Sequence, residues 1–491
     1  MLGMYVHTHW SYNRPYAART WTLDDWQRYL RGLASLGYDA VMLWPQCDVM
    51  PVHPNESDMA FLHKVRAIIR FAHDDLGMKF AIVAAANSIG NAESAQYRFE
   101  ERPYFLCEEH VNPSDKAAMK TFLEGRRRQF EPLSEADTLV IIDSDPGGYP
   151  GSTTEEFIAA VRAQLSIFRR LNSRSEFRLW LWFGWRNQCR FLEALQQGET
   201  NPIHCYFENQ KQAVAEELEL LKDQVEEPWS VTVGLPCHIA LTEHAPFAQR
   251  RLFFPYGLVE GEPTFPLTEY QPALLASRFA EFSFTAQRYP CGAMANAQTH
   301  CLQLPHTYLF AHLANGRAPV DANPAEFAER LLPDCGELLV AAWRSVGEAE
   351  PKRQRDIAAQ IRSRLDRATF LEDRSGLLFG APARFLTDLA MNLEVRAALR
   401  EFADAVASSA HVQPSLAALL PILKAYQERV GFTNACGGPL RTLLIEPAAS
   451  LGDADITLAL RNFDDWRHPE RRRVAVPVLL DALDAWCRRG S

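Results

Sequence analysis

Up to about residue 320, the chain alternates short apolar runs with longer stretches of helical periodicity. The short runs are rich in β-branched and aromatic residues, and most of them are apolar at nearly every position. This pattern is typical of parallel strands buried on both faces, so each run is predicted as a strand. The runs lie at residues 4–9, 40–44, 79–84, 138–143, 177–183, 203–207, 229–233 and 292–296.

The amphipathic stretches between these runs are predicted as helices. The first, at residues 23–36, has Thr22 as its N-cap and Gly37 after its end. The others lie at residues 58–76, 115–128, 154–171, 211–225 and 272–289. Eight strands that alternate with helices predict an α/β fold, a (β/α)8 TIM barrel. A doubly wound open sheet is the alternative, but no glycine-rich phosphate loop follows the first run.

From about residue 322 the strand-like runs stop and helical periodicity dominates. The chain is therefore expected to contain two domains, a catalytic barrel at residues 1–320 and an α-helical C-terminal domain at residues 321–491. The helical domain is expected either to form a homodimer or to wall one side of the cleft of the barrel.

Charge balance and cysteine spacing narrow the class of partner. Lys and Arg number 51 against 61 Asp and Glu, and the net charge of −10 is not the basic footprint of a nucleic-acid-binding protein. No run of about 18 apolar residues predicts a membrane span, and the N-terminal residues lack the pattern of a signal peptide. None of the ten cysteines has the C-x-x-C spacing of a metal site. We therefore expect a cytoplasmic protein without a membrane or nucleic-acid partner.

The segment Asp143-Ser144-Asp145 ends the fourth run, and the chemistry of a TIM barrel lies at the carboxyl ends of its strands. Side chains two apart on a strand share a face, so the two carboxyls are expected to lie close together and one pKa to rise. A raised carboxyl pKa suits a general acid that works near neutral pH. Asp145 is predicted as this acid, with Asp143 as its pKa partner or the alternate acid. A turn that caps the next helix is the alternative interpretation.

Two further acids follow later runs, Glu208 after the sixth and Glu243 after the seventh. Glycoside hydrolysis uses two carboxyls, about 5 Å apart for retention of configuration and roughly 6.5–9.5 Å apart for inversion. Glu208 is predicted as the base or nucleophile and Glu243 as a further catalytic candidate. Simple surface exposure is the alternative for each.

Aromatic and polar side chains at the strand ends are expected to form a sugar site around these acids. Four of the eleven tryptophans stand there, and indole faces stack on the apolar faces of sugar rings. Packing in the core would also explain each tryptophan singly. The predicted substrate-binding residues are His7, His9, Trp10, Trp44, Trp182, Trp185, Asn296, Gln298 and His300.

The segment His7-Thr-His9 supports a different chemistry, because metal-dependent amidohydrolase barrels hold two ligands at the end of the first strand. The rest of that ligand pattern is missing: the fourth run ends without a lysine, and the eighth ends in Asn296 rather than an aspartate. We expect no metal and no cofactor. A metal-dependent hydrolase centred on His7 and His9 is kept as an alternative, and a carbohydrate-binding barrel without catalysis as another.

The acids after the fourth, sixth and seventh runs, the aromatic strand ends and the trailing helical segment resemble those of glycoside hydrolase barrels. The layout is most similar to the family 67 α-glucuronidases and also similar to the hexosaminidase families 20 and 84. In those families the acid after the fourth strand protonates the leaving oxygen. The resemblance therefore implies this role for Asp143 or Asp145. Glu208 and Glu243 loosely match the later acids of the α-glucuronidases. The segment Asp-Ser-Asp differs from the Asp–Glu pair of family 20 and the adjacent Asp–Asp of family 84. The resemblance implies a glycoside hydrolase that acts on a carbohydrate by carboxylate acid–base catalysis.

Overall fold

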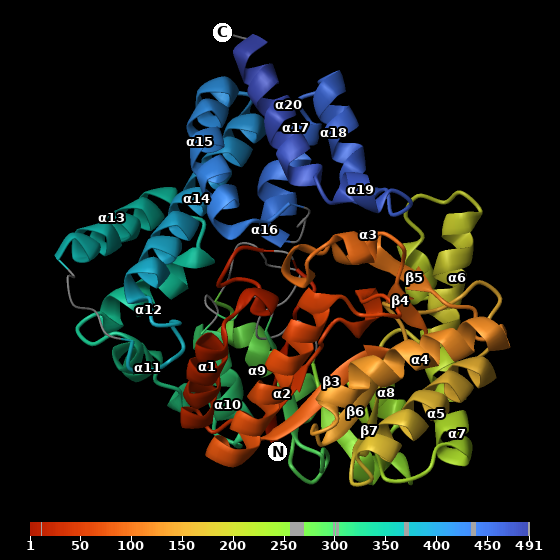
Figure 1. Cartoon of the computed structure of the whole chain (residues 1–491). Helices are drawn as coiled ribbons and strands as arrows, with labels where there is room; N and C mark the ends of the chain where they lie inside the picture. The colour runs from red at the N-terminus through yellow and green to blue at the C-terminus, as the bar shows by residue number, and fades with distance from the viewer. Residues whose placement is uncertain are drawn as a thin grey trace. The chain divides into compact units, whose positions relative to one another are not determined.

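The computed structural model describes residues 1–10, 12–255, 270–297, 300, 304–367, 373–433 and 438–489. Eight parallel strands form a closed barrel in the order β1-β10-β9-β8-β7-β6-β3-β2, which confirms the predicted TIM barrel. Figure 1 labels β3, β6 and β7 of these strands. The barrel strands are β1 (Leu2–Val6), β2 (Ala40–Leu43), β3 (Lys79–Ala85), β6 (Thr138–Ile142), β7 (Glu176–Trp180), β8 (Trp229–Val233), β9 (Arg251–Phe253) and β10 (Ala293–Ala297).

One predicted strand is wrong. Residues 203–207 do not extend but form a short 3-10 helix, η5 (Ile203–Tyr206). The run is not buried on both faces, since Ile203 and Phe207 are 45% and 62% exposed. The run at 229–233 is therefore the sixth barrel strand, and the seventh is β9, in a segment that carried no strand prediction. With three residues, β9 is too short to show a periodic pattern.

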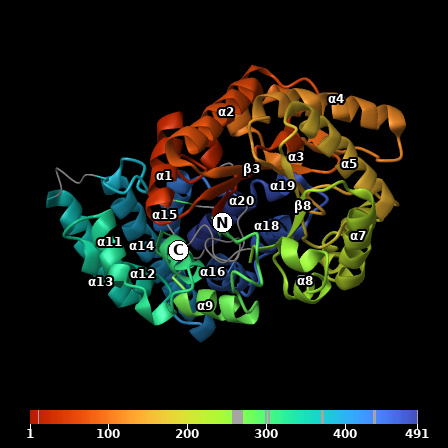
Figure 2. The same cartoon turned by 90° about the horizontal axis from the view of Figure 1, so that it is seen from below.

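Helices surround the barrel, and Figure 2 shows α2, α4, α5, α7 and α8 in an arc around it. Side-chain caps fix several of their starts; Asn55 and Asp58 form a capping box at the start of α2, as Thr153 and Glu156 do at α5. Helix α6 was not predicted. The bounds are α2 (Glu56–Leu76), α4 (Lys116–Leu133), α5 (Thr154–Leu171), α6 (Trp185–Gln196), α7 (Gln210–Gln224), α8 (Pro236–Leu241) and α9 (Pro272–Glu281), with the short η2 (Cys47–Val49) and η6 (Phe247–Arg250).

An insertion between β3 and α4 adds a small antiparallel sheet of two strands. Its elements are β4 (Ser88–Gly90), η3 (Ser94–Gln96), η4 (Phe99–Glu101), α3 (Tyr104–Cys107) and β5 (Glu108–His110). Because the insertion begins where β3 ends, it starts on the face of the barrel where a TIM barrel carries its active site.

The chain divides into two compact units, of which the first holds the barrel strands and comprises Met1–Ser11, Gly37–Tyr256 and Ser277–Asn296. The second comprises Tyr12–Leu36, Gly257–Ala276 and Ala297–Ser491, so the predicted helical domain at 321–491 belongs to it. Its described residues 304–367, 373–433 and 438–489 contain helices and no strand.

The second unit begins with η1 (Ala18–Thr20) and α1 (Leu23–Ser35). Its later elements are α10 (Leu304–Ala314), η7 (Pro319–Asp321), α11 (Pro324–Leu331), α12 (Gly336–Val346), α13 (Pro351–Arg367), α14 (Pro382–Ser408), α15 (Val412–Val430), α16 (Gly438–Leu440), the π-helix η8 (Arg441–Ile445), α17 (Glu446–Ala449), α18 (Ala454–Asp464), α19 (Pro469–Arg472) and α20 (Ala475–Arg489). None of the helices in the described part of the chain has the length and apolarity needed to span a membrane.

Candidate active site

The alternation of side chains along the strands determines which residues lie inside the barrel near the carboxyl ends of the strands. Tyr5 and Met294 belong to the core inside the barrel. Side chains two positions further on point to the same side, which directs His7 and Asn296 to the carboxyl end of the barrel interior. Both are buried. The strand pattern therefore brings these two predicted site residues together at the mouth.

Asn296 is fully buried, and neither its amide nitrogen nor its amide oxygen has a hydrogen-bond partner among the described residues. A buried polar group without a partner is costly, on the order of 1–3 kcal/mol. A ligand or an ordered water at the mouth of the barrel would supply the missing hydrogen bonds. Gln298, predicted beside it, lies outside the described residues.

His7 is a neutral imidazole with one nitrogen available. Its Nδ1 shares a hydrogen bond with the Tyr5 hydroxyl at 2.8 Å, and its Nε2 has no partner within the described part of the chain. Burial lowers the pKa of His7 to about 3. The ring stacks on His9, with centroids 4.2 Å apart. The stacked pair therefore presents His7 as a neutral hydrogen-bonding group.

The described residues contain no group of three or more His, Cys, Asp or Glu placed to hold a metal ion. His7 and His9 stack with an interplanar angle of 27°. Ring nitrogens bind a metal in the plane of the ring, so two rings lying face to face do not converge on one ion in this arrangement. The residues present therefore do not fit the metal centre of the alternative hypothesis.

The inserted segment contributes an aromatic side chain that the sequence did not single out. The Tyr104 ring lies 4.2 Å from the His9 ring. Tyr104 is buried, and its hydroxyl has no hydrogen-bond partner among the residues described. Burial raises the pKa of this hydroxyl well above its usual value, so it stays protonated and can donate. Tyr104 is thus a second polar group at the mouth with an unmet hydrogen bond.

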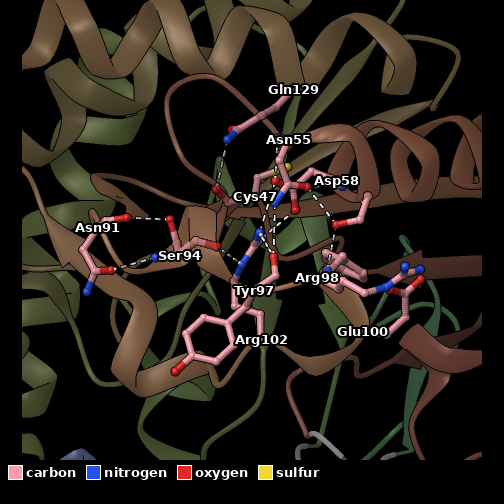
Figure 3. A network of polar contacts seen from close by, with 12 residues as sticks. Cys47, Asn55, Asp58, Asn91, Ser94, Tyr97, Arg98, Glu100, Arg102 and Gln129 are labelled. Atoms are coloured by element: carbon pink, nitrogen blue, oxygen red, sulfur yellow. Dashed lines mark hydrogen bonds and ion pairs between the residues drawn. The ribbon is translucent and has the colours of Figure 1, made fainter.

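A buried arginine fixes the insertion against α2, as Figure 3 shows. Arg102 donates to Asp58 through Nη1 at 2.6 Å and Nη2 at 3.2 Å, and both side chains are fully buried. Its Nε donates to the Ser94 carbonyl at 2.9 Å, and Nη2 also donates to the Tyr97 carbonyl at 3.2 Å. Because Arg102 lies two residues before Tyr104, this network sets the position of the Tyr104 ring.

Glu108 and His110 form an ion pair on β5, with 2.9 Å between Glu108 Oε1 and His110 Nε2. Burial lowers the pKa of His110, but the charge and hydrogen bond of Glu108 outweigh it, followed by the charge of Asp145, and the net shift is upward. Glu108 and Asp145 also raise the pKa of Tyr104. The two carboxyls therefore lie within electrostatic range of the same two side chains.

Asn87 ties three segments of the mouth together. Its Nδ2 donates to the Val111 carbonyl after β5 at 2.7 Å and to the Gly148 carbonyl at 2.9 Å. Its Oδ1 has no partner among the described residues. A Cβ on Gly147 would approach this oxygen to 3.3 Å, and Gly147 has a φ of +121°. Glycine therefore allows the turn after Asp145 to approach the Asn87 amide closely.

Asp143 and Asp145 do not share a strand face as the sequence predicted, because β6 ends at Ile142. Asp145 is exposed and adopts a left-handed conformation with a φ of 47°. Its backbone nitrogen donates to Gln188 Oε1 at 3.1 Å. Asp143 is fully buried. The two acids therefore have different surroundings, since Asp145 is exposed whereas Asp143 is buried.

Asp143 binds the loop between β7 and α6. Its Oδ2 accepts from the Trp182 nitrogen at 2.7 Å, and its Oδ1 accepts from the Ser144 hydroxyl at 2.6 Å. The Ser144 Oγ in turn accepts from the Phe183 nitrogen at 2.9 Å, and the Gly184 nitrogen also bonds to Asp143. Burial raises the pKa of Asp143 from 3.8 to about 6 against these hydrogen bonds.

A second buried carboxyl, Glu217 on α7, interacts with Asp143, and the sequence analysis did not single it out. Glu217 is fully buried and accepts a hydrogen bond from the Trp185 nitrogen. Burial, followed by the charge of Asp143, raises the pKa of Glu217 well above its usual value. Two carboxyls can hydrogen-bond only when one carries a proton, and the bond between them lowers the pKa of Asp143 and raises that of Glu217. Glu217 is therefore the protonated partner.

The predicted tryptophans have different surroundings. Trp44 is buried and donates to Asp48 Oδ2, and Asp48 is ion-paired with the fully buried Arg126 at 2.7 Å. Trp185 is fully buried and stacks on Phe157 at 4.9 Å. Trp10 is half-buried, with its ring 5.7 Å from that of His7, and Trp182 is half-buried against the barrel core. Only Trp10 and Trp182 therefore present a partly open indole.

Glu208 and Glu243 are both exposed and ion-paired. Glu208 lies 4.0 Å from Arg190 and 3.8 Å from His204, and Glu243 lies 2.7 Å from Arg288. In the described part of the chain, neither glutamate forms a hydrogen bond or an ion pair with His7 or Asp143. Their predicted catalytic roles remain predictions.

His300 belongs to the second unit, where it is buried. Its Nδ1 shares a hydrogen bond with the Tyr29 hydroxyl at 2.8 Å, and its ring lies 5.1 Å from that of Trp21. These contacts account for its burial within that unit, and its role in substrate binding remains a prediction.

No family model and no curated protein sequence matches the chain. A solved structure titled "Structure of CpGH84D" is similar in fold, with a TM-score of 0.44 and 11% sequence identity over 87% of this chain and 69% of that chain.

Proposed function

We propose that the protein is a glycoside hydrolase whose substrate sugar binds at the carboxyl end of the barrel, with Asp145 as the general acid. The observation that carries the proposal is the group of buried polar atoms without partners among the described residues: His7 Nε2, Tyr104 Oη, Asn87 Oδ1 and both amide atoms of Asn296. Sugars carry many hydroxyls, each of which donates and accepts, so they match such a mixed set of atoms.

Aromatic rings beside these atoms support a sugar rather than a small anion. The half-buried Trp10 lies near His7, and the Tyr104 ring lies near His9. Aromatic faces pack against the apolar faces of sugar rings while the surrounding polar groups bind hydroxyls. The imidazole of His7 is uncharged at neutral pH, so it contributes hydrogen bonding without attracting an anion.

Asp145 is the acid we assign to the reaction, because Asp143 is fully buried and engaged by the 182–184 backbone. Asp143 is then a positioning residue, which holds the loop that carries Trp182. Glu108 is the second carboxyl we propose, because it lies with Asp145 in electrostatic range of Tyr104 and His110. The exposed Glu208 and Glu243 are further candidates for that role.

The test is hydrolysis of a panel of aryl glycosides by the wild-type protein and by Asp145→Asn. A general acid contributes roughly 10²–10⁴-fold to the rate, so the variant is expected to lose activity by about that factor. Asp74→Asn serves as the matched control, since Asp74 is exposed near the end of α2 that leads into β3, at the opposite end of the barrel. Equal activity of Asp145→Asn and the wild type would reject Asp145 as the acid. Sugar binding without hydrolysis of any substrate would leave a carbohydrate-binding barrel.

A further inference from the structure

Three aromatic side chains form a continuous ridge from the β7–α6 loop to the surface. The Trp182 ring lies 4.6 Å from the Phe183 ring, which lies 5.4 Å from that of Phe207. Trp182 packs partly against the barrel core, Phe183 is half-buried, and Phe207 is 62% exposed. We call these three residues the aromatic ridge. A contiguous apolar surface that stays partly accessible can mark a binding site.

The inner end of the aromatic ridge is fixed by the buried carboxyl network. Trp182 N donates to Asp143, and Trp182 O accepts from Gln210 Nε2 at 3.0 Å. His238 Nε2 also contacts this oxygen at 3.0 Å. Because both the nitrogen and the oxygen of Trp182 are engaged, its indole is held on a rigid backbone.

The outer end is fixed by Asn187. Its Nδ2 donates to the Phe183 carbonyl and to the Tyr206 carbonyl, each at 3.0 Å, which joins the β7–α6 loop to η5. The Phe183 ring also stacks on that of Tyr206 at 4.7 Å. A preorganised aromatic surface binds a ligand with a smaller loss of conformational freedom than a mobile one.

Polar side chains rim the exposed end of the aromatic ridge. His204 and Glu208 flank Phe207 in sequence, and Arg190 lies 4.0 Å from Glu208; all three are exposed. An aromatic face with positively and negatively charged side chains at its rim suits a hydroxylated ring, whose hydroxyls can hydrogen-bond to those side chains. An apolar protein surface is a poorer match, because its binding would bury the same charges without partners.

We infer that the aromatic ridge binds a sugar residue next to the one that is cleaved, so that the preferred substrate is a neutral oligosaccharide rather than a monosaccharide glycoside. This inference rests on the proposed function. It commits to a carbohydrate occupant because Trp182, at the inner end, belongs to the mouth where the reacting sugar is proposed to bind. A chain that leaves the mouth across Phe183 and Phe207 would stack on successive rings.

The test is binding of neutral oligosaccharides of two to six residues from the gluco-, xylo-, manno- and N-acetylglucosamine series, measured by isothermal titration in an Asp145→Asn background. Phe207→Ala is expected to weaken binding about 10-fold, as loss of one aromatic contact predicts. Leu171→Ala is the matched control, because Leu171 is a 39% exposed apolar residue at the end of α5. It is expected to bind as the parent does.

The outcomes separate this inference from the proposed function. If the protein binds oligosaccharides in a way that depends on Phe207 but hydrolyses no glycoside of the panel, the inference about the aromatic ridge stands and the proposed hydrolase function is rejected. If the protein hydrolyses glycosides and Phe207→Ala binds oligosaccharides as tightly as the parent, the proposed hydrolase function stands and the inference about the ridge is overturned. The inference is also overturned if the wild-type protein binds no oligosaccharide. Sedimentation that shows self-association lost in Phe207→Ala would overturn the ridge in favour of an interface between copies of the chain.

Discussion

Glu217 on α7 and Asp143 after β6 are two fully buried carboxyls, and the interaction between them raises the pKa of Glu217 and lowers that of Asp143, which favours the proton on Glu217. Together with Ser144 they accept from four consecutive backbone nitrogens, 182–185, of the β7–α6 loop. This loop carries Trp182, so the buried carboxyl pair sets the geometry of one wall of the candidate site. The relationship leads to the first two predictions.

Asp143→Asn should destabilise the protein more than Glu217→Gln. A glutamine at 217 can accept from Trp185 N and donate to Asp143, as the protonated glutamate does. An asparagine at 143 would turn its amide NH2 toward groups that also donate, leaving a buried donor unpaired at a cost of about 1–3 kcal/mol. Urea denaturation of both variants measures the difference in the free energy of unfolding. Equal destabilisation would contradict the assignment of the proton to Glu217.

The carboxyl pair should also make stability depend on pH. Both pKa values are raised on folding, so the native state binds protons more tightly than the unfolded chain. The stabilising contribution is therefore fully present below the ordinary pKa values near 4 and is lost as the pH rises through about 6. Glu217→Gln removes one of the titrating groups. Its free energy of unfolding relative to wild type should accordingly rise between pH 4 and pH 7, by on the order of 1–3 kcal/mol. A difference that stays constant with pH would show that the pair does not share a proton.

Tyr104→Phe and Asn296→Leu should separate stability from binding. Each change removes buried polar atoms that have no partner in the described part of the chain. Stability is therefore expected to stay the same or to rise by about 1 kcal/mol in thermal unfolding. The KM for an aryl glycoside should increase, because the missing partners are proposed to be sugar hydroxyls. Loss of stability with unchanged KM would indicate that these atoms serve the fold.

Arg102→Met should loosen the insertion that carries Tyr104. Breaking one side of a buried ion pair costs about 3–5 kcal/mol, because Asp58 would remain charged and buried without its partner. Hydrogen exchange is expected to rise in residues 88–110. Arg98→Met is the control, since Arg98 is largely exposed and lies 4.0 Å from Glu100 in the same insertion. Equal exchange in both variants would contradict the anchoring role of Arg102.

The sequence predicted the barrel because short apolar runs indicate strands buried on both faces, and capped amphipathic stretches indicate the helices that cover them. It failed at residues 203–207, where Ile203 and Phe207 are apolar but exposed, so composition alone imitated a strand. It missed β9 because three residues show no period. Because of these errors, the sequence analysis numbered the strands before Glu208 and Glu243 wrongly and expected both residues at the mouth of the barrel. In the structure both glutamates are exposed.

Within the candidate site, the sequence indicated His7, Asn296, Trp182 and Asp145 because each lies at or shortly after the end of a predicted strand. The sequence predicted a raised pKa for one of Asp143 and Asp145 because the two carboxyls were expected to lie close together, whereas burial is what raises the pKa of Asp143. A signal for Glu217 was present: the buried positions of α7 are 213, 214, 217, 218 and 221, so this glutamate stands in an apolar stripe. Tyr104 had no comparable signal, because an irregular insertion rather than a strand positions it.

The measurement that tests the account most directly is the dependence of Asp145→Asn on the leaving group. A general acid matters most when the leaving oxygen is basic and least when it leaves as a stable anion. For the aryl glycoside that wild type hydrolyses best, the variant should lose about 10²–10⁴-fold in kcat/KM with a phenyl leaving group and almost nothing with dinitrophenyl. An equal loss for both leaving groups, or no loss with the phenyl glycoside, would contradict the assignment of Asp145 as the proton donor.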